Sequence, residues 1–281
     1  MTDKNDKNDK NDDTVYLHGF SRTEQARLMK QARIAESIVF RNIDYTGAQR
    51  LLEVGSGVGA QTEILLRRFP DLHATCVDLS EAQLAAAREH LGGMPQLADR
   101  YTLQQADAGD LPFEPRSFDA AFLCWVLEHV PSPARVLSEI RRVLAPGSPV
   151  YITEVMNSSF LLDPYSPNVW RYWMAFNDFQ HEHGGDPFVG AKLGNLLLAG
   201  GYRDVTTELK TFYFDNREPA RRKVMIGFWE ELLLSAADKL VEAGAVTQDI
   251  VDGMRREMHQ VQNDPNAVFF YAFVQARAVV Y

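Results

Sequence analysis

Between residues 50 and 155, short apolar runs alternate with segments of helical periodicity. The apolar runs are RLLEV (50–54), HATCV (73–77), YTLQQ (101–105), FDAAFLC (118–124) and PVYITEV (149–155), and the helical segments span 60–69, 81–91 and 133–144. Strands that alternate with helices form βαβ units, which build a mostly parallel sheet with helices on both faces. We therefore expect an α/β, Rossmann-like, doubly wound fold for this region.

The segment before residue 50 predicts one capped helix. Ser21 and Glu24 form a capping box, and apolar side chains then recur at helical spacing, so we expect a helix from about 22 to 41. An aromatic arm that carries His18 precedes this helix. The polar DKN repeat at 1–13 has nothing to bury, which favours a disordered tail.

Beyond residue 156 the alternation of strands and helices breaks down. Residues 157–185 are rich in aromatic side chains and favour loops. The elements expected after them are a helix at 186–202, a strand at 202–214, two charged amphipathic helices near 219–243 and 247–262, and a final apolar strand, VFFYAFVQARAVV. The charged helices are candidates for a cap or for a homodimer surface.

Composition limits the partners of the chain. The formal net charge is −9, with 38 acidic against 29 basic residues, which argues against nucleic acid or an anionic membrane as the main partner. The two cysteines, Cys76 and Cys124, are too few for a disulfide framework, so we expect reduced thiols and a cytoplasmic location. The longest apolar runs fall well short of the roughly 18 residues that span a bilayer.

A glycine-rich turn follows the first expected strand, in the order Gly55-Ser56-Gly57-Val58-Gly59-Ala60. Glycines adopt backbone angles closed to other residues, and the helix that follows offers free N–H groups to a ligand. The pattern also satisfies the dinucleotide form G-x-G-x-x-G/A. The turn alone therefore predicts a nucleotide site without identifying the nucleotide.

Three carboxylates accompany the turn. Glu53 lies at the end of an apolar strand, where a carboxylate without a partner is costly and would repel a pyrophosphate, so we expect it beside a cationic amino acid group. Asp78 ends the second strand, where a carboxylate can accept both ribose hydroxyls. Asp107 follows the third strand, where it can accept a hydrogen bond from an adenine amino group. The last two positions suit a dinucleotide as well as a nucleotide that carries a cationic amino acid group.

These residues belong to a set of motifs that resembles class I S-adenosylmethionine-dependent methyltransferases. The motifs are EVGSGVG (53–59), VDLS (77–80), Asp107-Ala108 with Leu111-Pro112, SFD (117–119) and LEHV (127–130). The set covers roughly residues 50–155 and is most similar to the small-molecule branch that includes ubiquinone- and menaquinone-biosynthesis enzymes.

The resemblance implies a seven-stranded sheet with an antiparallel last strand, which the final apolar run can fill. It also implies S-adenosyl-L-methionine as the cofactor. The expected organisation is then an N-terminal lid (arm and helix) at 14–48 and a methyltransferase domain at 49–281. Insertions at about 157–190 and 216–263 would cap the acceptor, and the C-terminal half would contain helical insertions.

Residue roles carry over by motif position. The turn residues Gly55, Ser56, Gly57 and Gly59 would line the methionine part of the cofactor, and Glu53 would face its ammonium group. Asp78 would hold the ribose. Leu79 would pack on the adenine, whose edge would meet Asp107 and Ala108, and Cys124 and Trp125 would lie beside the sulfonium.

The acceptor pocket is expected from two aromatic regions. In the arm, Tyr16 is a candidate for a lid contact with the cofactor and for catalysis, and Phe20 for binding of the acceptor. The other acceptor-binding candidates are Trp170, Trp173, Phe176 and Phe179, with Phe188, Phe228 and Trp229 as further aromatic candidates.

Two histidines in the sequence QHEHGGD add polar candidates. His181 and His183 are candidates for a general base, and His181 also for a clamp on the acceptor. His-x-His without a third ligand at a recognisable spacing does not predict a metal site, so we expect no metal.

We therefore expect a methyltransferase that moves a methyl group from S-adenosylmethionine to a small, partly apolar metabolite by direct displacement in a lidded pocket. Two alternatives stay open. An NAD(P)-dependent oxidoreductase is disfavoured by Glu53 and by the lack of a Tyr-x-x-x-Lys motif in the second half. A methyltransferase-like domain that binds the cofactor without methylating has the same motifs. The sequence does not separate O-, N- and C-methylation.

Overall fold

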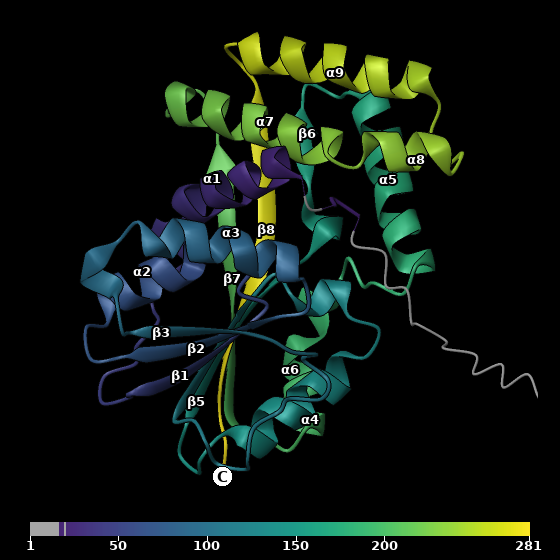
Figure 1. Ribbon diagram of the computed structural model, residues 1–281. Helices are drawn as coiled ribbons and strands as arrows, with labels where there is room; N and C mark the ends of the chain where they lie inside the picture. Colours follow the sequence, from purple (N-terminus) through teal and green to yellow (C-terminus); the bar gives the residue numbers. More distant parts are fainter. Residues whose placement is uncertain (1–16, 20) are drawn as a thin grey trace, which may run out of the picture.

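A computed structural model of the protein describes residues 17–19 and 21–281. Its strands form one sheet in the order β3-β2-β1-β4-β5-β8-β6, and β7 pairs with β8 as well (Figure 1). The strands are β1 (Arg50–Val54), β2 (His73–Asp78), β3 (Tyr101–Gln105), β4 (Ala120–Cys124), β5 (Pro149–Val155), β6 (Leu161–Asp163), β7 (Arg203–Phe214) and β8 (Val268–Val279). Strands β1 to β5 are parallel, whereas β8 runs antiparallel to its three neighbours.

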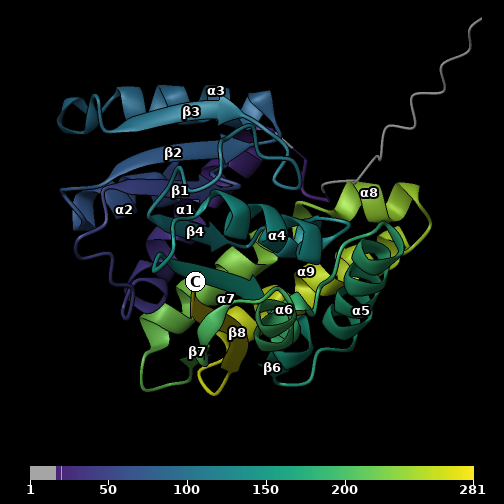
Figure 2. The ribbon, with the colours of Figure 1, turned by 90° about the horizontal axis from the view of Figure 1, so that it is seen from below.

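Helices cover both faces of the sheet (Figures 1 and 2). One face is covered by α1 (Arg22–Val39), α2 (Ala60–Arg68) and α3 (Glu81–Gly92), and the other by α4 (Pro133–Val143) and α6 (Leu193–Ala199). Neighbouring residues of a strand point to opposite faces. Leu51 accordingly belongs to the apolar core on the α1 side, and Leu52 to the core on the α4 side.

Serine caps fix where several of these helices begin. The Ser21, Ser80 and Ser132 side chains each accept a hydrogen bond from a backbone N–H of the first turn, at 3.1–3.4 Å. Such caps satisfy donors that the helix itself leaves free. Short 3-10 helices connect other elements: η1 (Pro95–Leu97), η2 (Leu127–His129), η3 (Asn157–Ser159) and η4 (Val189–Lys192).

A helical cap stands over the carboxyl ends of the parallel strands (Figure 1). It contains α5 (Pro167–Glu182), α7 (Pro219–Leu234), α8 (Ala237–Glu242) and α9 (Gln248–Asn263), and α9 packs on both α5 and α7. Strand β8 joins the cap to the sheet, because its end pairs with β5 and its start pairs with β6. Strand β8 therefore belongs both to the sheet and to the cap.

The predicted fold is confirmed, with three differences. The segment predicted as loop at 157–185 is mostly helix α5, which begins with a proline after Ser166, and it also contains the additional short strand β6. The single helix predicted at 219–243 is divided at Ser235–Ala236, where the Ser235 hydroxyl donates to the Leu232 carbonyl at 2.7 Å. The helix predicted at 186–202 is reduced to η4 and α6.

The tail predicted at 1–13 lies outside the described residues. No helix in the described part of the chain has the length and apolar character that a bilayer crossing requires.

Candidate functional site

The glycine turn after β1 is held by backbone hydrogen bonds to the end of β2. The N–H groups of Gly55 and Ser56 both donate to the Val77 carbonyl, at 2.8 and 3.0 Å. The φ angles of Gly55, Gly57 and Gly59 are +69°, +52° and +74°, a region that side-chain-bearing residues rarely adopt. A Cβ atom on Gly55 would also lie 2.5 Å from a methyl carbon of Val126. Glycine is therefore required at this position both for its backbone angle and for the space.

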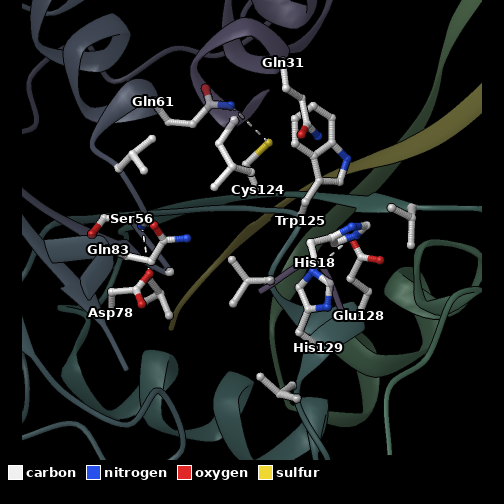
Figure 3. A pocket seen from close by; sticks show the side chains of 18 of the residues that line it. His18, Gln31, Ser56, Gln61, Asp78, Gln83, Cys124, Trp125, Glu128 and His129 are labelled. Atoms are coloured by element: carbon white, nitrogen blue, oxygen red, sulfur yellow. Dashed lines mark hydrogen bonds and ion pairs between the residues drawn. The ribbon is translucent and has the colours of Figure 1, made fainter. Parts of the chain in front are cut away.

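A cavity of about 830 Å³ opens beside this turn. One part of its lining, the nucleotide half, consists of Gly55, Ser56, Gly57, Gln61, Asp78, Leu79, Asp107 and Ala108. The other part, the aromatic half, consists of Trp173, Phe176, Phe212, Phe228, Trp229 and Tyr271. Figure 3 shows Cys124 between Ser56 and Asp78 on one side and His18, Glu128 and His129 on the other.

Asp78 braces the turn and faces the cavity. One carboxylate oxygen accepts the Gly57 N–H at 2.8 Å, and the other accepts the Ser80 N–H at 2.9 Å. Burial raises the pKa of Asp78, while these two hydrogen bonds act in the opposite direction. Next to it, Leu79 lines the cavity with 69% of its surface exposed. An acceptor oxygen beside an exposed apolar side chain suits a sugar that carries a flat base.

Asp107 and Ala108 line the same half of the cavity, and their role at an adenine edge stays a prediction. One Asp107 carboxylate oxygen accepts the Gly109 N–H at 2.7 Å, so the side chain is fixed at the end of β3. Gly59 does not line the cavity. It caps the start of α2, where a Cβ atom would lie 3.0 Å from Leu91.

Glu53 differs from its predicted role. It is 2% exposed and does not line the cavity. The Thr62 hydroxyl donates to its carboxylate at 2.6 Å, and the Cys76 thiol lies 3.5 Å from the same oxygen. Burial raises the pKa of Glu53 to about 7. Its contacts show a carboxylate that holds α2 to the strands, rather than one that meets a bound ammonium group directly.

Two side chains of the nucleotide half carry buried hydrogen-bonding atoms without a partner in the described part of the chain. Among the described residues, the Ser56 hydroxyl and the Gln61 amide oxygen are buried and have no hydrogen-bond partner. Both side chains line the nucleotide half. Because a buried polar atom without a partner costs free energy, these two atoms fit a polar ligand that completes their hydrogen bonds.

The loop after β4 is bound to β5. Trp125 has a φ of +59°, which is uncommon for a residue with a side chain, and its N–H donates to the Thr153 carbonyl at 2.8 Å. One oxygen of the buried Glu154 accepts the N–H groups of Val126 and Leu127, at 3.0 and 2.7 Å. This loop therefore presents Cys124 and Trp125 to the cavity in one orientation.

Burial, followed by the charge of Glu128, raises the pKa of Glu154 to about 8. In the unfolded chain the carboxyl group ionises near 4.5, so between these two values the native state holds a proton that the unfolded state has released. The free energy of unfolding contributed by Glu154 therefore falls as pH rises through this window.

We expect Glu154→Gln to remove this loss, because an amide keeps the acceptor oxygen and does not ionise. Relative to the wild type, the variant should gain roughly 2–4 kcal/mol of stability between about pH 5 and about pH 9. Urea unfolding of both proteins across this range measures the difference. If the unfolding free energies of the two proteins changed with pH in parallel, the raised pKa of Glu154 would be contradicted.

The predicted aromatic residues are only partly brought to the cavity. Trp173 and Phe176 line it, with rings stacked at 5.4 Å, as do Phe228 and Trp229. Trp170 packs on Phe160 outside the lining. The remaining candidates are Phe179 and Phe188, which do not line the cavity, and Tyr16 and Phe20, which lie outside the described residues.

The two candidate histidines are not at the cavity. His181 and His183 are exposed at the carboxyl end of α5, and neither lines the cavity. His183 stacks on Phe179 at 3.9 Å. Helix α5 turns its aromatic face inward, so its last turn carries both imidazoles away from the site. Because neither histidine reaches the cavity, the prediction that one of them acts as a general base, or that His181 clamps the acceptor, is corrected. The described residues contain no group of three side chains arranged to hold a metal ion.

Several polar residues of the cavity were not predicted as site residues. They are His18, Gln31, Gln61, Glu128 and Asn157, together with Tyr271 of the aromatic half. The Tyr271 hydroxyl donates to the Asn157 amide oxygen at 2.8 Å. A tyrosine inside an otherwise apolar last strand, VFFYAFV, was the available signal for that position.

Comparisons with known proteins agree with this geometry. Residues 52–152 match the family described as "Methyltransferase domain". The chain is 35% identical over 162 residues to the O-methyltransferase cnsE of Penicillium expansum, which covers 56% of this chain and 54% of that protein. It is 34% identical over 114 residues to a demethylmenaquinone methyltransferase of Clavibacter sepedonicus, which covers 41% of this chain and 44% of that one. The chain thus spans about half the length of the curated relatives it matches.

Solved structures show the same fold. One is phosphoethanolamine N-methyltransferase 2 of Haemonchus contortus in complex with S-adenosyl-L-methionine, with a TM-score of 0.59 at 21% identity over 94% of this chain and 58% of that one. Another is a putative methyltransferase of Bacillus halodurans, with a TM-score of 0.53 at 18% identity over 92% of this chain and 98% of that one.

Proposed function

We propose, from the match of residues 52–152 to the family described as "Methyltransferase domain", that the chain is an S-adenosylmethionine-dependent enzyme that methylates a small, partly apolar molecule. One observation carries the proposal. A single cavity joins the nucleotide half to the aromatic half, and Cys124 and Trp125 lie in its lining. Such a cavity suits a cofactor and an acceptor bound side by side.

The nucleotide half fits S-adenosylmethionine. Asp78 would accept the ribose hydroxyls, and Leu79 would pack on the adenine, whose edge would meet Asp107 and Ala108. The free oxygen of Gln61 would accept a hydrogen bond from the ammonium group, in place of the direct contact predicted for Glu53. When bound, this cofactor supplies a methyl group on a sulfonium, which needs no further activation.

The residues around the cavity then act mainly by alignment. Proximity and orientation together contribute on the order of 7–11 kcal/mol to well-aligned reactions. Here the rigid loop after β4 sets the position of the cofactor, and the aromatic half holds the acceptor against it while excluding water. The curated relatives named as an O-methyltransferase and a demethylmenaquinone methyltransferase support an organic acceptor of moderate size.

We expect S-adenosylhomocysteine, and not NAD, to stabilise the purified protein. A ligand at about 100 times its Kd stabilises the native state by about 2.7 kcal/mol, which raises the melting temperature by several degrees for a chain of this size. Thermal melts with each ligand at equal concentration measure this. Stabilisation by NAD alone would favour the oxidoreductase. Stabilisation by S-adenosylhomocysteine without methyl transfer to any acceptor would favour a binding domain.

We further propose a cytoplasmic location, supported by the two free cysteines, Cys76 and Cys124. A homodimer through the helices of 216–263 stays a prediction, which light scattering of the purified protein tests.

A further inference from the structure

One carboxylate in the cavity lining is held in a fixed position. Glu128 is 8% exposed and lines the cavity. The Gln180 side-chain amide donates to a carboxylate oxygen of Glu128 at 3.0 Å and to its backbone carbonyl at 3.2 Å. The Asp186 N–H donates to the same carbonyl at 2.9 Å. The segment QHEHGGD therefore serves to hold Glu128, although its histidines point elsewhere.

A second carboxylate, Glu154, lies beneath the first. Its raised pKa of about 8 leaves it largely protonated at neutral pH. Within the described part of the chain, no lysine or arginine forms an ion pair with Glu128, and the imidazole of His129 lies beside it, with Nε2 3.6 Å from a carboxylate oxygen. The titratable groups facing Glu128 from the surrounding elements are Cys124, His129, Glu154 and Tyr271, and His18 packs beside His129.

The aromatic half also contains an unused hydrogen-bond donor. The indole N–H of Trp229 is buried, and it has no hydrogen-bond partner among the described residues. The Trp229 ring lies 4.6 Å from the ring of Tyr271 and is stacked on Phe160 at 5.4 Å, so it cannot easily turn to another partner. A buried donor without a partner costs free energy, so this N–H suits an oxygen on a bound molecule.

We propose that Glu128 takes the proton from the hydroxyl that is methylated, and that the acceptor is a flat, ring-bearing hydroxyl compound with a second oxygen that accepts the Trp229 N–H. The inference rests on the proposed function and specifies its acceptor. A hydroxyl can donate to the Glu128 carboxylate, whereas a carboxylate acceptor would be repelled by it. The stacked aromatic walls match a planar ring.

The transfer then balances as a single displacement. The acceptor oxygen forms a bond to the methyl carbon while the bond from that carbon to sulfur breaks, and the bonding electrons stay on sulfur. The hydroxyl proton passes to a Glu128 carboxylate oxygen. The products are a methyl ether and a neutral thioether, with one proton on Glu128 that is later lost to solvent.

Glu128→Gln tests the proton transfer, because the amide keeps an oxygen for Gln180 but cannot take a proton. With 1-naphthol at about pH 8, we expect kcat to fall by about 10²–10³-fold while KM and stabilisation by S-adenosylhomocysteine are kept. With 4-nitrophenol, which is largely ionised at that pH, the loss should be less than about fivefold or become a gain, since no proton has to move and the amide does not repel the phenolate. Glu182→Gln, an exposed carboxylate of α5, is the matched control.

Trp229→Phe tests the second contact, because it keeps an aromatic ring and removes the N–H. We expect KM for 1,5-dihydroxynaphthalene to rise about fivefold more than KM for 1-naphthol, which lacks the second oxygen and loses only ring contact.

An equal loss with both phenols in Glu128→Gln would overturn the role of Glu128. Methyl transfer to amines or carbon acids but to no hydroxyl compound would overturn the inference and leave the proposed function intact. If S-adenosylhomocysteine does not bind at all, the proposed function itself fails.

Discussion

Asp78→Ala is expected to weaken the binding of S-adenosylhomocysteine by about a hundredfold. Both carboxylate oxygens accept backbone N–H groups of the site, from Gly57 at 2.8 Å and Ser80 at 2.9 Å. Hydrogen bonds to a charged group are worth about 1.5–3 kcal/mol each, and 1.4 kcal/mol corresponds to tenfold in Kd. The substitution removes the proposed ribose contacts and also the brace that holds the glycine turn.

Isothermal titration of the purified variants measures this effect. Glu81→Ala is the matched control, because Glu81 begins α3 only three residues away, pairs with Arg88 on the exposed surface and does not line the cavity. Its affinity should stay within about twofold of the wild type. Unchanged affinity in Asp78→Ala would contradict the placement of the ribose.

Gly190→Ala should destabilise the protein by about 3 kcal/mol. A Cβ atom there would lie 2.5 Å from the Val155 carbonyl oxygen and 2.6 Å from that of Glu154. Both are backbone atoms of β5, which cannot move without disturbing the sheet, and overpacking of this kind costs about 1–3 kcal/mol or more. The loop after β4 depends on the same part of β5, through Thr153 and Glu154.

Gly194→Ala, only four residues away, should have the opposite sign. It lies in α6, and its Cβ would meet a Thr207 methyl carbon at 3.6 Å, an ordinary contact. Alanine is favoured over glycine in a helix by up to about 1 kcal/mol. Urea unfolding of the two variants gives both values, and equal stabilities would show that β5 gives way to the added methyl group.

The parallel sheet could be predicted almost to the residue, because its apolar runs are short, separated and bounded by turn signals. The cap could not be predicted as well. Helix α5 is rich in aromatic side chains, which weakened its helical pattern, although Ser166-Pro167 marks its start. The break at Ser235–Ala236 could not be predicted because no glycine or proline lies there.

The site shows the same division between local and long-range information. Gly55 and Asp78 follow from local motifs, and the structure places both at the cavity. For Glu53, a sequence shows that a carboxylate interrupts an apolar strand, but not whether its partner is a ligand or Thr62, nine residues away in α2. The pairing of Glu128 with Gln180 depends on contacts between distant segments, which no periodicity reveals.

Strand β8 has a practical consequence for redesign. It pairs with β7 along nearly its whole length, with β5 at its end and with β6 at its start under the cap, and it contributes Tyr271 to the cavity. The cap is therefore not a transplantable module, since excising it would cut a strand out of the scaffold. New selectivity for the acceptor is better sought by exchanging side chains on the inner faces of α5 and α7, without changing β8, the strand that the sheet and the cap share.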